Sequence, residues 1–342
     1  MSESAGGSNT SRRRFLLTGV ATVLGSSLVT FAGVELFLRA TGRQPRRPVR
    51  WPEVGLFGPD PSLGWRPVPG HYQLPPLGPG GVPFEITFRA DGARVSGPLP
   101  PGGRPEVLLL GCSITMGSSI SNDQTYGWRL QELRPDVEVV NRAVEGYGTL
   151  QSLMVLENVL ARGGPKPGRV LYGFIDHAQR NVATPDWLWT LSFSKTKVAT
   201  PYCTLTGRQL ERHPPAAYPW LPFHEQLAAV ELIENNVNWR RAAHRRAMAV
   251  PVTKLLLSEM AALCRTQGIG FSLVVLHVSE RVKEIYVPYA LEHGIDVIDC
   301  NIPKFGRDGV VPGDLHPNGK VHRAWGECIA AALAEPSRLP PR

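Results

Sequence analysis

The fold is decided by the stretch Glu-Val-Leu-Leu-Leu-Gly-Cys-Ser at residues 106–113. Its apolar run is typical of a strand buried in a parallel sheet, and the glycine marks where that strand ends. Runs of the same kind recur at residues 137–140, 170–174, 271–276 and 295–298. Segments with helical periodicity separate them, at residues 125–134, 150–161, 252–266, 282–292 and 317–334. This alternation predicts a three-layer α/β/α sandwich with a central parallel sheet.

Functional sites of such sheets lie beyond the carboxyl ends of the strands, which is where Ser113 is expected. A hydroxyl needs a neighbouring base to act as a nucleophile at neutral pH. Asp314 and His316 precede the last predicted helix. Side chains two residues apart on an extended loop point the same way, so Asp314 could orient the imidazole toward a hydroxyl. Taken separately, Ser113 is most simply a serine in a turn and His316 a residue that caps a turn. Ser113, Asp314 and His316 together, in this order along the chain, indicate a catalytic triad.

These blocks resemble those of the SGNH (GDSL-like) hydrolase family. Gly-Cys-Ser-Ile-Thr at residues 111–115 is similar to the first block, usually Gly-Asp-Ser. Residues 141–148 resemble the second block, whose glycine falls at Gly146, and residues 314–317 resemble the last. The preamble from Gly64-Trp65 to Asp91-Gly92-Ala93-Arg94 also looks like that of membrane-anchored bacterial members. The resemblance implies a flavodoxin-like SGNH hydrolase fold over most of residues 60–336, with a small β preamble and a helical insertion.

The chain departs from the family pattern in three places. Cys112 replaces an aspartate that does no chemistry in the family, and Asp314 lies one residue closer to the histidine than the usual acid. In the third block, Ile175 stands where an asparagine normally donates to the oxyanion. His177 is the first candidate to replace that donor and Asn181 the second, although a structural role for His177 is equally open.

The resemblance implies an exported or membrane-anchored serine esterase, a carboxylic ester hydrolase acting on an O-acyl ester. Ser113 would attack the carbonyl, His316 would move the proton, and Asp314 would hold the imidazole. The backbone amides of Ser113 and Gly146 would receive the oxyanion. Glycan O-acetyl groups, lipid esters and small esters remain open as substrates, as does transfer of the acyl group to another hydroxyl.

The alternative from another class is a non-catalytic binding or assembly protein on the same fold, which the altered third block favours. A Rossmann cofactor domain is a distant third reading, because no Gly-x-Gly-x-x-Gly follows the first strand. We expect no cofactor and no metal, since zinc-ligand spacing is absent. Five cysteines without a Cys-x-x-Cys pair predict no disulfide framework, and most of them are expected to be buried thiols.

Residues 1–50 predict a signal or anchor segment and a basic linker. Arginines at positions 12–14 lead into an uncharged stretch from 15 to 34, which is long enough to cross a bilayer and resembles a twin-arginine export signal. Its apolar continuation to Arg39 favours an anchor, with a cleaved signal still open. Eight arginines and two glutamates here supply +6 of the net charge of +8, so no nucleic-acid partner is expected for the body.

Residues 51–104 predict a Pro/Gly-rich linker and a β preamble with a strand at 84–89. The hydrolase domain is expected to span residues 105–336 and to be followed by a tail at 337–342. An insertion at about 181–250 interrupts the alternation, with a Pro-rich turn at Pro214, Pro215 and Pro219 and an amphipathic helix around 225–248. We interpret the arginines of that helix as a solvated face, with anionic lipid or glycan as the second interpretation.

Overall fold

The computed structural model describes residues 7–45, 55–98, 103–192 and 199–335. The expected tail and parts of the expected linker, at residues 51–54 and 99–102, lie outside the described residues. The chain divides into two compact units. The first contains Met1–Val49 and Pro219–Arg241, and the second contains Arg50–Tyr218 and Ala242–Arg342.

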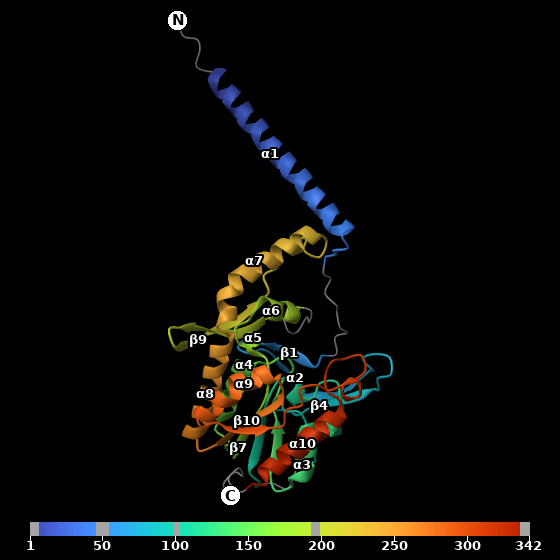
Figure 1. Cartoon of the computed structure of the whole chain (residues 1–342), viewed down its shortest axis with the longest axis vertical. Helices are drawn as coiled ribbons and strands as arrows, with labels where there is room; N and C mark the ends of the chain where they lie inside the picture. Colours follow the sequence, from blue (N-terminus) through green and yellow to red (C-terminus); the bar gives the residue numbers. More distant parts are fainter. Residues whose placement is uncertain (1–6, 46–54, 99–102, 193–198, 336–342) are drawn as a thin grey trace. The chain divides into compact units, whose positions relative to one another are not determined.

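The second unit is built on a five-stranded parallel sheet in the order β11-β10-β7-β5-β6 (Figure 1). Its strands are β5 Glu106–Gly111, β6 Glu138–Asn141, β7 Arg169–Ile175, β10 Gly270–His277 and β11 Asp296–Asp299. Numbered along the chain, this is the 2-1-3-4-5 order of flavodoxin-like sheets. Helices cover both faces, so the predicted three-layer sandwich is confirmed.

The two helical layers pack on opposite faces of this sheet (Figure 1). One layer holds α3 Tyr126–Leu133 and α10 Gly319–Leu333; the other holds α4 Thr149–Ala161, α8 Ala249–Thr266 and α9 Glu280–Glu292. Along β5, Val107 and Leu109 join the first layer's core, whereas Leu108 and Leu110 join the second. All four are fully buried, which is why this strand is apolar throughout.

The preamble forms two short antiparallel pairs. They are β1 Phe57–Asp60 with β2 Gly64–Pro67, and β3 Gly70–Leu74 with β4 Phe84–Phe88. Trp65 on β2 is completely buried, and its indole N–H donates to the Glu145 carbonyl at 2.9 Å. The preamble therefore packs directly on the loop that follows β6, and the predicted strand at 84–89 is β4.

The insertion contains more than the predicted helix. Its elements are α5 Ala178–Asn181, α6 Pro185–Ser192, β8 Ala199–Thr206, β9 Gln209–Ala217 and α7 Ala228–Ala247. The predicted Pro-rich turn is wrong, because Pro214 and Pro215 lie inside β9. The β8–β9 register is irregular there, between the Thr200–Ala216 and Tyr202–His213 pairs, so the prolines occupy a bulge where they interrupt little of the ladder.

The N-terminal segment is one long helix, α1 Gly7–Ala40. Its stretch Arg13–Ala40 is long and apolar enough to cross a membrane, and none of its most apolar window is buried. The bent pair α7–α8 is also long and apolar enough to cross a membrane if taken as one span, but α8 packs against the sheet and supplies much of its core. Two short 3₁₀ turns, Asn122–Gln124 and Arg307–Gly309, complete the described elements.

A disulfide joins Cys300, just beyond β11, to Cys328 in α10, with Cα atoms 5.9 Å apart. This bond was not expected, because the two cysteines are 28 residues apart and belong to no motif. The other three, Cys112, Cys203 and Cys264, are buried thiols as predicted. The bond ties the edge strand of the sheet to the last helix.

Replacing Cys328 with serine should lower the free energy of unfolding by about 3 kcal/mol, because the open chain regains the entropy that the ring removes. Chemical denaturation of the detergent-solubilised full chain measures the change. The double variant Cys300→Ser/Cys328→Ser is the control, since a reductant should destabilise the wild type and leave this variant unaffected. Equal denaturation midpoints for wild type and Cys328→Ser would contradict the prediction.

Candidate active site

Ser113 begins the short helix α2, Ser113–Met116, directly beyond the carboxyl end of β5. Thr115 lies against both Gly111 on β5 and Gly173 on β7, so closely that a Cβ on either glycine would overlap its hydroxyl. Gly111 also has a φ of +151°, which side-chain-bearing residues avoid. The two glycines thus let α2 pack onto the strand ends and fix where Ser113 leaves the sheet.

A buried arginine holds the loop that follows α2. The guanidinium of Arg94 donates to the carbonyls of Met116 at 2.8 Å, Ile120 at 2.7 Å and Gly117. Its backbone N–H donates to the Asn141 carbonyl at 2.8 Å. No carboxylate among the described residues pairs with this guanidinium, and burial lowers its pKa to about 9. Arg94 therefore fastens the loop after Ser113 to the preamble and to β6.

The loop after β6 runs beside Ser113. Asn141 donates to the Thr115 carbonyl at 2.9 Å, and the backbone N–H of Val144 donates to the Gly111 carbonyl at 3.2 Å. Gly146 has a φ of +83°, and a Cβ there would lie 2.9 Å from the Trp65 ring. Only glycine fits this position, which brings the second sequence block next to the first.

Asp314 and His316 form a hydrogen-bonded pair on the loop before α10. His316 Nδ1 lies 2.7 Å from Asp314 Oδ2, and Asp314 also accepts from the Ser119 hydroxyl and from the Leu315 N–H at 2.7 Å. Burial raises the pKa of Asp314, but the hydrogen bond and charge of His316, with Ser119 and Leu315, outweigh it and hold that pKa at about 2. The carboxylate stays ionised and can orient the imidazole.

The Ser119 hydroxyl links this acid–base loop to the loop after Ser113. Ser119 has a φ of +68°, an uncommon conformation for a residue with a side chain. Its hydroxyl donates to Asp314, 195 positions along the chain. Within the described part of the chain, however, neither the Ser113 hydroxyl nor His316 Nε2 makes a hydrogen bond. The Ser–His contact of a working triad is thus not formed in this structure.

His177 follows β7 at the same edge of the sheet. Burial first, then the charge of Arg180, hold its pKa well below its ordinary value, and the nearby His316 and His277 act in the same direction. A hydrogen bond to the Asp176 backbone acts in the opposite direction but does not outweigh burial. The ring is therefore neutral at pH 7 and carries one N–H, for which the Asp176 backbone is one partner. Its Nε2 is buried without a hydrogen-bond partner among the described residues.

Asn181, the other candidate donor, is occupied. Its amide donates to the hydroxyls of Thr149 at 3.1 Å and Thr253 at 2.8 Å, and its oxygen accepts from the Leu150 N–H at 3.1 Å. Both N–H groups of this amide are used in joining α5 to α4 and α8. The structure thus leaves it no hydrogen to offer a substrate.

Arg180 was not singled out from the sequence. Its guanidinium donates to the Tyr147 carbonyl at 3.0 Å, lies 4.3 Å from the centre of the Trp187 ring, and interacts electrostatically with the Cys112 side chain. Arg180 thus places a cation beside the residue preceding Ser113. None of Arg180, Arg94 and Ser119 belongs to a local sequence motif for this chemistry. Of the three, only Arg94 was named from the sequence, as the end of the preamble.

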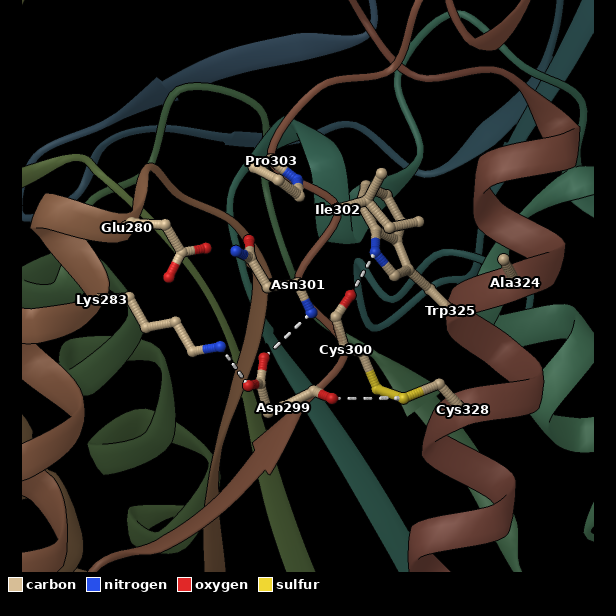
Figure 2. A pocket seen from close by; sticks show the side chains of 10 residues that line it. All are labelled: Glu280, Lys283, Asp299, Cys300, Asn301, Ile302, Pro303, Ala324, Trp325 and Cys328. Carbon is tan, nitrogen blue, oxygen red and sulfur yellow. Dashed lines mark hydrogen bonds and ion pairs between the residues drawn. A yellow bond between two sulfur atoms is a disulfide. The ribbon is translucent and has the colours of Figure 1, made fainter.

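One cavity lies apart from the candidate catalytic residues. It measures about 390 Å³ and lies beyond β11, where Figure 2 shows the Cys300–Cys328 disulfide and the Lys283–Asp299 ion pair on its walls. None of the candidate catalytic residues lines it. The described residues also hold no group of three or more His, Cys, Asp or Glu side chains placed to bind a metal ion.

No protein-family model and no curated protein matches this chain. Several solved structures are similar to its fold, at low sequence identity. A psychrotrophic esterase, EstA, from Pseudoalteromonas sp. has a TM-score of 0.41 and 10% identity, over 67% of this chain and 97% of that one. A putative lipolytic protein of the G-D-S-L family from Desulfitobacterium hafniense has a TM-score of 0.38 and 14% identity, over 67% of this chain and 100% of that one. The structure of TesA has a TM-score of 0.41 and 15% identity, over 68% of this chain and 99% of that one.

Proposed function

We propose that this chain is a serine ester hydrolase of the SGNH type, with Ser113, His316 and Asp314 as its triad. The observation that carries the proposal is the 2.7 Å bond between an ionised Asp314 and His316 Nδ1. That bond leaves Nε2 as the nitrogen available to a hydroxyl. The loop carrying it is tied by Ser119 to the segment that follows the strand-end serine.

In the proposed reaction, Ser113 Oγ bonds to the carbonyl carbon of an ester while His316 Nε2 takes the hydroxyl proton. The Ser113–His316 hydrogen bond must form when substrate binds, because catalytic hydrogen bonds are often long or absent in structures without substrate. His316 then returns the proton to the leaving alcohol as its C–O bond breaks. Water repeats the sequence on the acyl-enzyme and releases the acid. A sugar hydroxyl in place of water would make the same site an O-acyltransferase.

The developing oxyanion is proposed to lie near the backbone N–H groups of Ser113 and Gly146. Neither group donates a hydrogen bond to a described residue. His177 is the preferred third donor, because the amide hydrogens of Asn181 are already used. This donor would replace the asparagine that Ile175 displaces.

The chain is proposed to act outside the cytoplasm and to stay anchored by α1. Disulfides persist mainly in oxidising compartments, which fits the Cys300–Cys328 bond. Phe31-Ala32-Gly33 is a poor match to the small-residue site at which signals are cleaved. Glu35, which follows it, is buried and accepts from the N–H groups of Ala228 and Ala229, so the end of α1 belongs to a folded unit. Use of the twin-arginine export route is proposed from the sequence of residues 11–17 alone.

The second candidate function is a non-catalytic binding or assembly protein on the same fold. Two observations favour it: Ile175 stands at the donor position, and the Ser113 hydroxyl has no hydrogen bond among the described residues. The hydrolase is preferred because a binding protein has no need of an Asp–His pair together with a strand-end serine.

A fluorophosphonate probe should label the wild-type chain, because a triad makes the serine hydroxyl nucleophilic. Labelling should disappear in Ser113→Ala and fall at least about 100-fold in His316→Ala. Ser118→Ala is the matched control, since it removes a nearby buried hydroxyl and should leave labelling intact. Labelling is read by gel fluorescence on equal amounts of folded protein. No labelling of the wild type would favour the binding-protein alternative.

Removing the proposed third donor should slow turnover without weakening substrate binding. We expect His177→Ala to lower kcat about 100-fold with little change in KM, as for a contact made only in the transition state. His177→Asn should recover part of the loss, because asparagine restores an N–H. Steady-state kinetics with a short-chain aryl ester tests both variants. Wild-type turnover in His177→Ala would assign His177 a structural role.

The Asp314–His316 bond should make stability depend on pH in the acidic range. The native pKa of Asp314 is lowered from 3.8 to about 2, so its contribution is present above 3.8 and is lost as pH falls through 2. After allowance for solvent screening, the wild type should lose about 1 kcal/mol of unfolding free energy over this pH range that Asp314→Asn does not lose. Denaturation midpoints of wild type and variant between pH 6 and 2 measure it, with the exposed Asp123→Asn as control. Parallel pH profiles for wild type and Asp314→Asn would contradict this role.

A further inference from the structure

The first unit exposes apolar side chains outside α1 as well as on it. They belong to residues 219–227, here called the aromatic loop, and to the first turns of α7. The exposed set is Trp220, Leu221 and Phe223 in the loop, and Ile233, Val237 and Trp239 in the helix. Phe223 is the most exposed of them, at 67%. Large apolar side chains gathered in this way usually mark an interaction surface.

The backbone of Phe223 is held in an unfavourable conformation. Its φ is +66°, in the left-handed region that residues with bulky side chains avoid. Its carbonyl accepts from the N–H groups of Gln226 at 3.0 Å and Leu227 at 2.9 Å, and these bonds keep the turn closed. Such conformations persist where the surrounding structure enforces them, often at functional positions. Here the enforced turn leaves an aromatic ring exposed, not packed in the core.

The aromatic loop is fastened to α7. The buried carboxylate of Glu234 accepts from the Leu221 N–H at 2.6 Å and lies 3.3 Å from His224 Nδ1. Asn238 donates to the Pro219 carbonyl at 3.3 Å. The loop therefore presents Leu221 and Phe223 from a defined scaffold.

The last turns of α1 are joined to the same scaffold. Glu35 accepts from the N–H groups of Ala228 at 3.1 Å and Ala229 at 2.8 Å, which caps the start of α7. Arg39 pairs with Glu35 at 2.6 Å and donates to the Gln226 carbonyl at 2.6 Å. These bonds bring the aromatic loop close to the end of the apolar span, where Phe37 is still 66% exposed.

We infer that the aromatic loop and the start of α7 insert into the head-group region of the lipid leaflet where α1 ends. The occupant of this apolar surface is thus the bilayer itself. The inference rests on the proposed anchor, because α1 sets the depth at which the loop lies. Tryptophan and phenylalanine suit this boundary, and the exposed Arg240 and Arg241 can reach anionic head groups.

The test is lipid quenching of a fluorophore on the full chain, reconstituted in vesicles of phosphatidylcholine and phosphatidylglycerol. An environment-sensitive dye is attached to Phe223→Cys or, as a second site, Leu221→Cys, while the native thiols are buried. Leu24→Cys in α1 reports on the anchor, and Leu291→Cys, 60% exposed in α9, is the matched control on the second unit. The quenchers are a lipid with a spin label near its head group and aqueous iodide.

We expect the lipid quencher to act at least about threefold more strongly at Phe223 and Leu221 than at Leu291, with iodide showing the opposite order. Quenching by lipid at Leu24 but not at the two loop positions, with iodide reaching them, would overturn the inference and leave the anchor standing. Protection of the loop from both quenchers would also overturn it, by showing a protein cover such as a second copy. No lipid quenching at Leu24 would refute the anchor itself.

Discussion

The guanidinium of Arg94 is buried with no carboxylate of the described residues to neutralise it, and the loop beyond Ser113 is folded around it. Carbonyl dipoles of that loop take the place of water, so the charge and the loop depend on each other. Losing either partner would leave buried polar groups without hydrogen bonds, which costs about 1–3 kcal/mol for each group. Because Arg94 follows β4 and its backbone bonds to Asn141, the preamble is an internal support of the candidate site.

The candidate site also concentrates positive charge where negative charge would develop. Arg180 lies beside Cys112, and Arg94 lies beneath the loop after α2, while His177 is kept neutral. The carboxylate of Asp314 lies behind His316. Fixed dipoles and cations held in place by the protein stabilise an oxyanion more than mobile water does. This electrostatic pattern accompanies the loss of the usual asparagine at Ile175.

The parts of the fold that were predictable from sequence are those with local patterns. The three inner strands β5, β7 and β10 are buried along nearly their whole length, so each is a largely apolar run, and Asp314 and His316 are close in sequence. The hairpin β8–β9 was missed because its strands carry polar residues and three prolines on an isolated pair. Arg94, Ser119 and the Cys300–Cys328 bond act between distant segments, and no local spacing signals such contacts.

The disulfide determines what a proteolytic cut would do to the candidate site. Its 28-residue ring encloses the loop of Asp314 and His316, and Leu315 between them is 89% exposed. Exposed loop tips are preferred sites of proteolytic nicking. A cut beside Leu315 would separate the acid from the base along the backbone, yet α10 would stay joined to β11 through Cys328. Cleaved molecules would remain single covalent pieces until a reductant released the last helix.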